Sequence, residues 1–163
     1  MKKFLVLTAS ALLLVACSST KEGAELYGDA NGGWQEDVDV TNLTATALTK
    51  KLQKTGTDVV YFSFNSSGLD SQAKADLRTQ AEFLKENPTA LVVIEGRCDE
   101  RGTREYNLAL GDQRANAARS YLIAQGVAAN RIRTISYGKD KPVVLGSDEE
   151  AWAKNRNATT VAY

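Results

Sequence analysis

The sequence predicts an α/β (α+β) fold in which four strands alternate with helices, in the order βαβαβαβ, and form one four-stranded mixed sheet. Short runs rich in β-branched, aromatic and aliphatic residues recur at residues 59–64, 91–94, 131–137 and 157–163. Between these runs, apolar residues recur every three or four positions, as on one face of a helix. Helices that alternate with strands in this way pack on the sheet that the strands form.

The first 16 residues predict a lipoprotein signal peptide. Lys2 and Lys3 precede an apolar run, residues 4–16, that is too short to span a bilayer. Small residues end the run directly before Cys17, and a polar Ser-Ser-Thr follows. This arrangement resembles a bacterial lipobox, in which the chain is cut before Cys17 and the cysteine is acylated. An ordinary signal peptide with a chance cysteine is the alternative.

The next stretches predict a tether and a short helix. Because Ser18 is not an aspartate, the resemblance to a lipobox favours the periplasmic face of the outer membrane. Residues 17–40 are rich in small polar residues and glycine, which predicts a flexible linker. Residues 41–57 predict a lead-in helix that ends at Gly56. The domain proper is predicted over residues 58–163.

The first half of that domain predicts two strands and a helix. Residues 59–64 are apolar on both faces, which is typical of an interior strand. Asp70 or Ser71 then caps a helix, and Pro88 ends it. Residues 91–94 are a second apolar run and predict a buried strand.

The second half continues the alternation. Thr103 predicts the cap of a long helix with Glu105 in its first turn, and Gly126 follows its end in the usual terminating position. Residues 131–137 predict the third strand.

The end of the chain has the weakest signals. Ser147 and Glu150 form a capping box for a short helix through Trp152. Residues 157–163 predict the last strand, although threonines dilute its apolar face.

Composition excludes several classes of function. The chain carries 20 basic and 20 acidic residues, and without Lys2 and Lys3 the balance is 18 to 20. A chain with no basic excess and no basic tract is not expected to bind nucleic acid. It has no histidine, which removes the commonest general base and the commonest metal ligand. We therefore predict no catalytic residue, no metal and no cofactor.

A loop crowded with both signs of charge follows the second predicted strand. Its charged residues are Arg97, Asp99, Glu100, Arg101, Arg104 and Glu105. In open α/β sheets, ligands tend to bind where the carboxyl end of a strand leads into a helix. We therefore expect a ligand to bind at this loop. Cys98, inside the loop, is interpreted as a small residue at the end of a strand.

An arginine interrupts the apolar face of the helix that follows this loop. The residues on that face are Leu110, Arg114, Ala117, Ala118 and Tyr121. Because the face packs on the sheet, the guanidinium must find a carboxylate or a cavity, and Asp99 is the obvious carboxylate. One interpretation is a closed ion pair between Asp99 and Arg114 that only pins the loop. The other is a pocket into which both groups point. That pocket would suit a zwitterion, because the acid meets an ammonium and the arginine clamps a carboxylate.

Six motifs are spread along the predicted domain: VYFSF at 60–64, EGRCDERGT at 95–103, YNLALG at 106–111, SYG at 136–138, KPVVLG at 141–146 and KNR at 154–156. Together they resemble the motifs of the OmpA-like peptidoglycan-binding domains. The resemblance implies an outer-membrane lipoprotein that binds the meso-diaminopimelate stem of peptidoglycan non-covalently and tethers the membrane to the wall. It also implies the Tol system as a partner, above all the periplasmic protein TolB. In the family, the surface that TolB binds overlaps the peptidoglycan-binding site.

The resemblance assigns roles to individual residues. The binding acid of the family falls on Asp99 and its binding arginine on Arg114. The residues that line or support the pocket are Phe64, Asn65, Glu100, Arg101, Asn107 and Leu110. Asn65 stands where the family usually has an aspartate, so charge assistance worth about 1 kcal/mol is lost there. Arg97 stands where uncharged residues are common, and it can compete for Asp99.

Two alternatives to wall binding remain. In a wall-degrading enzyme, Glu95 and Asp99 would be the carboxylate pair. They lie four positions apart across a strand end, among arginines that favour ionised acids, so we predict that the protein is not an enzyme. In the other alternative, the protein is an adaptor for a Tol partner with weakened wall binding, and Asn65 and Arg97 keep this interpretation open.

Overall fold

A computed structural model of the chain describes residues 40–163, and side chains from Thr44 onward. The predicted signal peptide, Cys17 and the linker lie outside the described residues, except that Val40 begins the first helix. The elements, in chain order, are α1 (Val40–Gln53), β1 (Val59–Tyr61), α2 (Ser71–Glu86), β2 (Val92–Arg97), α3 (Arg104–Ala124), a 3₁₀ turn (Ala129–Arg131), β3 (Ile132–Gly138), α4 (Glu149–Asn155) and β4 (Asn157–Ala162). No helix in this part of the chain is long and apolar enough to cross a membrane.

The strands form one mixed sheet in the order β1-β4-β2-β3, which confirms the predicted fold class. β4 is antiparallel to both β1 and β2, whereas β2 and β3 are parallel neighbours joined through α3. A parallel pair needs such a crossover connection, and a helix supplies it. The pairing of β2 and β3 shifts register between Gly96 and Arg97, so the strand is irregular where the charged loop begins.

The first strand does not lie where its sequence predicts. Residues 59–64 predict an interior strand, but β1 is a short edge strand, and that prediction is wrong. Its ladder ends at Tyr61, opposite Asn157, and one further bond follows, from the Phe62 amide to the Arg156 carbonyl (2.9 Å), where the chain enters β4 from α4. The polar β4 is interior. It buries Thr160, whose hydroxyl is paired with the Gln80 side chain on α2 at 2.7 Å.

The caps predicted for the two long helices are confirmed, and the cap of the short helix is corrected. The Asp70 carboxylate accepts from the Ala73 amide at 2.8 Å, and the Thr103 hydroxyl accepts from the Tyr106 amide at 3.2 Å. Asp148, not Ser147, caps α4, because its carboxylate reaches the free amides of the first turn. That helix also runs past Trp152 to Asn155.

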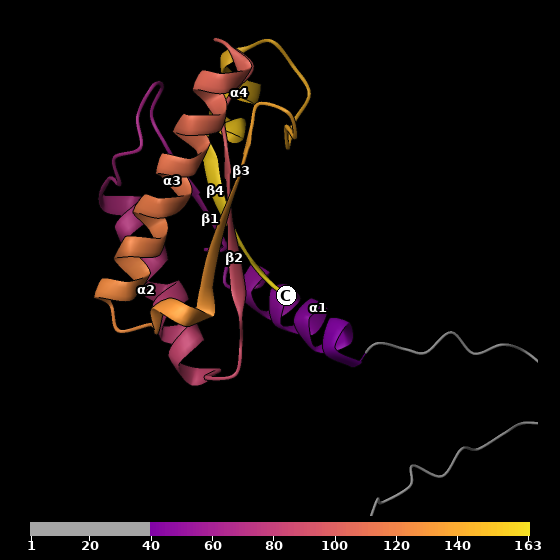
Figure 1. Cartoon of the computed structure of the whole chain (residues 1–163), viewed down its shortest axis with the longest axis vertical. Coiled ribbons are helices and arrows are strands. Elements are labelled where there is room, and N and C mark those ends of the chain that lie inside the picture. Colours follow the sequence, from indigo (N-terminus) through magenta and orange to yellow (C-terminus); the bar gives the residue numbers. More distant parts are fainter. Residues whose placement is uncertain (1–39) are drawn as a thin grey trace, which may run out of the picture. The chain divides into compact units, whose positions relative to one another are not determined.

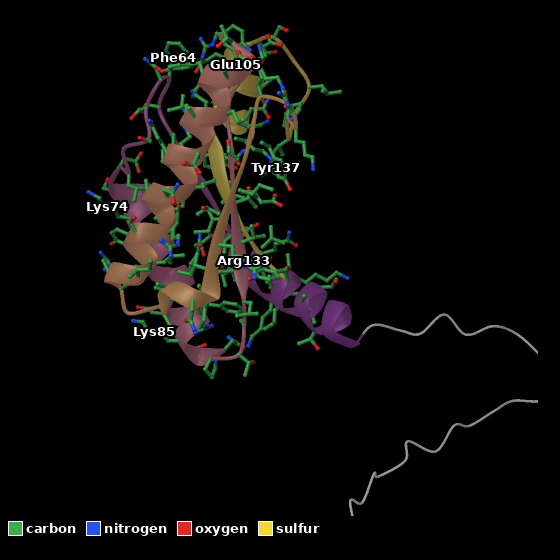
Figure 2. All side chains as sticks on the ribbon, in the orientation of Figure 1. Phe64, Lys74, Lys85, Glu105, Arg133 and Tyr137 are labelled. Atoms are coloured by element: carbon green, nitrogen blue, oxygen red, sulfur yellow. The ribbon has the colours of Figure 1, made fainter. Side chains whose placement is uncertain are left out.

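The core lies between one face of the sheet and helices α2 and α3, which cover that face together (Figure 1). Its fully buried side chains include Leu77 and Leu84 of α2, Ile94 of β2 and Leu122 of α3. α1 lies beside the C-terminal end of β4, where the Thr49 hydroxyl accepts from the Ala162 amide at 3.0 Å. Arg133 and Tyr137 lie on the side of the sheet away from α2 (Figure 2).

Two glycines set the distance between α3 and the sheet. A Cβ built on Gly96 would lie 1.9 Å from the Gly111 carbonyl oxygen, and one built on Gly111 would lie 2.4 Å from the Ser136 hydroxyl. The backbones of β2 and α3 therefore touch directly. This close approach places the first turns of α3 against the end of β2, where the charged loop begins.

Replacing Gly96 by alanine is expected to destabilise the fold by more than about 3 kcal/mol, because the clashing atom is backbone and has no side-chain freedom with which to yield. Urea denaturation of the variant measures this. Gly68→Ala is the matched control: its Cβ would meet only the Ser66 hydroxyl at 3.4 Å, so the free energy of unfolding should change little. Equal stability of the two variants would contradict the close approach of Gly96 to the Gly111 carbonyl.

Candidate functional site

A cavity of about 400 Å³ opens at the end of the domain where β1 and β2 end and α3 begins. Its lining residues are Phe64, Asn65, Cys98, Asp99, Arg101, Gly102, Tyr106, Asn107, Leu110 and Arg114. Figure 2 shows Phe64 at the same end of the molecule as Glu105, in the first turn of α3. The β1–α2 loop, the β2–α3 loop and the first half of α3 therefore build the walls.

The structure brings together all but one of the pocket residues that the sequence predicts. The exception is Glu100, which is exposed and accepts a hydrogen bond from the Trp152 indole at 3.1 Å. Glu100 instead lines a separate cavity of about 160 Å³. Cys17 lies outside the described residues.

Sequence reasoning missed three of the lining residues, Cys98, Gly102 and Tyr106. All three lie inside the motifs that carry the family resemblance, at residues 95–103 and 106–111. The motifs therefore included these three residues, but nothing in the sequence indicated that they line a cavity.

Asp99 lies at the bottom of the charged loop and is only 4% exposed. Arg101 grips its carboxylate with two side-chain nitrogens, Nη2 to Oδ2 at 2.6 Å and Nε to Oδ1 at 3.2 Å. The Arg101 backbone amide donates to the same Oδ1 at 3.2 Å. Arg156, which precedes β4, approaches Oδ2 to 3.5 Å. Asp99 is therefore held in one orientation by two arginines, one from its own loop and one from the segment before β4.

These contacts decide the charge of Asp99. Burial favours the neutral acid, but the hydrogen bonds from the side chain and backbone of Arg101 outweigh it, so the pKa of Asp99 lies below its ordinary value. The group is therefore an anion throughout the neutral and mildly acidic range.

Arg114 is almost fully buried, at 1% exposure, and is paired with backbone rather than with an acid. Its Nε donates to the Ser66 carbonyl at 2.9 Å, Nη1 to the Arg97 carbonyl at 2.8 Å and Nη2 to the Ser63 carbonyl at 3.1 Å. These three bonds use one N–H of each guanidinium nitrogen, and the guanidinium also lies within hydrogen-bond reach of the Cys98 thiol. Burial lowers the pKa of Arg114, but a guanidinium remains protonated at physiological pH.

The closed ion pair between Asp99 and Arg114, one of the two interpretations of the sequence, is not present. Asp99 pairs with Arg101 and Arg156, whereas Arg114 donates to carbonyl oxygens. Both groups nevertheless line the same cavity. The reason is positional: Arg114 lies beneath the loops whose carbonyls converge on it, and Arg101 is only two residues from Asp99.

The expected competition of Arg97 for Asp99 is also wrong. Arg97 forms its ion pair with Glu95, and its other nitrogens donate to the Lys141 carbonyl at 3.1 Å and the Thr159 hydroxyl at 3.2 Å. Residues two apart on a strand share a face, so Arg97 joins Glu95 and points away from the cavity.

Asn65 and Tyr106 close one side of the cavity. The Tyr106 hydroxyl donates to the side-chain oxygen of Asn65. Asn65 has a positive φ of 54°, a conformation that asparagine tolerates better than most residues. The amide oxygen that faces the cavity thus already has a donor of its own.

The backbone of the charged loop is fixed from two sides. The Asn107 side-chain amide donates to the Arg101 carbonyl at 2.8 Å and to the Thr103 carbonyl at 3.0 Å. On the other side, the Lys139 ammonium donates to the carbonyls of Glu100 and Gly102. The loop is therefore held by its backbone, whereas the Arg101 side chain is held only at its tip.

Cys98 lies on the floor of the cavity and is 3% exposed. Its thiol donates to the Asn107 carbonyl at 3.3 Å. Burial raises the pKa of this thiol despite the nearby Arg114, so the neutral thiol is the resting form. This agrees with its interpretation as a small residue at a strand end.

Comparison with known proteins adds the relatives of this chain. The OmpA family matches residues 61–156. The chain is 44% identical over 154 residues to a peptidoglycan-associated lipoprotein of Rhizobium meliloti (strain 1021), a match that covers 92% of this chain and 81% of the relative. It is 41% identical over 161 residues to a peptidoglycan-associated lipoprotein of Pasteurella multocida (strain Pm70), covering 99% and 97%. The crystal structure of the peptidoglycan-associated lipoprotein from Burkholderia pseudomallei superposes with a TM-score of 0.63 at 46% identity, covering 65% of this chain and 90% of that one.

Replacing Asp99 by asparagine is expected to destabilise the fold by about 1–3 kcal/mol at neutral pH, because buried charged donors lose their acceptor. The contribution of Asp99 is complete above the pKa of an unfolded aspartate, about 3.9, and is lost as the pH falls through the lower pKa of the folded state. The free energy of unfolding of both proteins is measured by urea denaturation. Their difference should be constant down to about pH 5 and shrink below that. A difference that does not depend on pH would contradict the assignment.

Proposed function

The chain belongs to the OmpA family and, within it, to the peptidoglycan-associated lipoproteins, and from this premise we propose that its cavity binds the meso-diaminopimelate stem of peptidoglycan. The observation that carries the proposal is the pairing of opposite charges in one cavity. Asp99 and Arg114 both line it, yet neither neutralises the other. A ligand with an ammonium and a carboxylate on one carbon complements the two groups, and diaminopimelate presents such a pair at the end of its side chain.

Arg114 is proposed to bind the ligand carboxylate. The backbone carbonyls use only one N–H of each terminal nitrogen, so the second N–H of each would pair with a bidentate carboxylate in place of the Cys98 thiol. Because three backbone carbonyls already orient the guanidinium, little side-chain entropy is lost on binding.

The other lining residues are proposed to supply the apolar and polar walls. Phe64 at the rim and Leu110 at the base offer surface for the methylene chain of the ligand. Asn65 replaces the acid of the family and offers an amide oxygen, and Asn107 supports the loop. Glu100 lies away from the cavity, so we assign it no contact.

We propose that the protein binds without catalysis. The chain has no histidine to activate a nucleophile. Asp99 is held as an anion by two arginines, and a glycosidase acid must instead keep its proton near neutral pH.

We further propose that residues 1–16 are a signal peptide and that Cys17 carries the acyl chains that hold the protein on the periplasmic face of the outer membrane. Residues 17–40 would then be the linker and residues 58–163 the wall-binding domain. With its lipid anchor in the outer membrane and its domain on the peptidoglycan, the protein would tether these two layers of the envelope.

Co-sedimentation with purified diaminopimelate-type peptidoglycan tests the wall site. The protein is expected to pellet, and Asp99→Asn to lose at least about tenfold in affinity, because a neutral amide cannot pair with an ammonium. Asp140→Asn is the control: it removes the same charge from an exposed residue that pairs with Arg104 outside the cavity. If Asp99→Asn is folded by circular dichroism and pellets like the control, the proposed site is wrong.

A second candidate function is an adaptor for the Tol system with weak wall binding, which the neutral, already hydrogen-bonded Asn65 favours. We propose that TolB and peptidoglycan compete for this end of the domain. Excess TolB is therefore expected to release the protein from the wall into the supernatant. A folded protein that binds TolB but never pellets would favour the adaptor, and a pellet unchanged by bound TolB would exclude competition.

A further inference from the structure

The carboxylate of Asp99 is fully occupied in the ligand-free protein. A carboxylate offers about four lone-pair positions. Oδ1 accepts from the backbone amide and Nε of Arg101, both at 3.2 Å. Oδ2 accepts from Arg101 Nη2 at 2.6 Å and from Arg156 Nη1 at 3.5 Å. A ligand ammonium can therefore reach Asp99 only if it displaces one of these donors.

Arg101 is the donor that can be displaced. Its side chain is 33% exposed, against 9% for Arg156. Arg156 is also fixed elsewhere, because it donates to the Phe62 carbonyl at 3.0 Å and to Glu149 at 2.7 Å. The Arg101 guanidinium has Asp99 as its one carboxylate partner among the described residues.

Two aromatic rings hold the Arg101 guanidinium in this place. Its central carbon lies 4.0 Å from the ring centroid of Phe64, in the β1–α2 loop, and 4.1 Å from that of Trp152, in α4. Such cation–π contacts stabilise a guanidinium without using its N–H groups. Trp152 does not line the cavity, so its contact is with Arg101 and not with the space that a ligand would fill.

We propose that Arg101 is an internal competitor for Asp99 and thereby determines specificity, since it makes the site demand a ligand that carries both an ammonium and a carboxylate. The inference rests on the proposed function. An ammonium alone merely exchanges one cation on Asp99 for another and leaves the displaced guanidinium unpaired beside it. A ligand that also brings a carboxylate gains a charge-assisted contact with the Arg114 guanidinium and adds a negative charge that offsets the displaced cation. Arg101 thus lowers the affinity for a ligand that carries only an ammonium more than it lowers the affinity for a zwitterion.

Two soluble stem peptides that differ by one carboxylate measure this selectivity. They are L-Ala–γ-D-Glu–meso-diaminopimelate and the same peptide ending in L-lysine, titrated calorimetrically into the full chain. Arg101→Met is expected to bind the lysine peptide about tenfold more tightly than wild type, whereas affinity for the diaminopimelate peptide changes by less than about threefold. Arg101→Lys keeps the competing cation and should remain close to wild type.

Two further variants control the comparison. Arg104→Met removes the same charge from an arginine that pairs with Asp140 outside the cavity, and it should leave both affinities unchanged. Trp152→Ala removes one of the two rings that hold Arg101, and it should raise affinity for the lysine peptide in the same direction as Arg101→Met by a smaller factor.

The ligand-free protein gives an independent readout. Nuclear magnetic resonance titration of the Asp99 carboxyl should show a higher pKa in Arg101→Met than in wild type, because burial is then opposed by fewer donors. Arg104→Met should not move it.

The outcomes separate this inference from the function on which it rests. If wild type binds neither peptide, the wall site fails and the role of Arg101 fails with it. If wild type binds diaminopimelate and Arg101→Met only loses that affinity, Arg101 is a ligand contact and the inference is overturned while the wall site stands. An unchanged titration of Asp99 in Arg101→Met also overturns it. Tighter binding of the lysine peptide together with the shifted titration supports it.

Discussion

The buried guanidinium of Arg114 connects two stretches of backbone by donating to three of their carbonyls. Ser63 and Ser66 belong to the loop after β1, and Arg97 ends β2. A charge at 1% exposure is costly unless every direction around it is satisfied, and three carbonyl acceptors with Phe62 at 5.3 Å provide that. The same bonds fix the two loops that wall the cavity. The fold and the candidate site therefore both depend on this one group.

The charged side chains in this site form one connected network of ion pairs. Asp99 is shared by Arg101 and Arg156, and Arg156 in turn reaches Glu149 at the start of α4. Among the residues that the structure describes, no buried side-chain nitrogen or oxygen lacks a hydrogen-bond partner. The resting site is thus closed on itself, so a ligand must replace internal contacts and not merely fill space. In such a site, specificity comes from how well the ligand matches what it displaces.

Other features show how the fold holds this arrangement in place. The contact between Gly96 and Gly111 brings α3 close enough for Arg114 to reach the end of β2. Asn107 and Lys139 fix the backbone of the loop, whereas the Arg101 side chain is held by Asp99 and two aromatic rings. Its two aromatic neighbours come from the β1–α2 loop and α4. The motifs at residues 60–64, 95–103 and 106–111 therefore contribute side chains to one cavity at this end of the domain.

The sequence by itself determined the alternation of strands and helices, a cap at Asp70 or Ser71 and another at Thr103, and the charged loop with Asp99 followed by the buried Arg114, because these depend on local periodicity and on the cost of burying charge. Only the tertiary structure decided that the polar β4 is interior and the apolar β1 an edge, since a buried threonine is tolerated once Gln80 is opposite it. It also decided which partners the charges take. Arg97 faces away with Glu95, Glu100 turns to Trp152, and Arg101 rather than Arg114 pairs with Asp99. Spacing along a chain predicts which face a side chain occupies, but the choice among several nearby partners depends on distances between segments that only folding brings together.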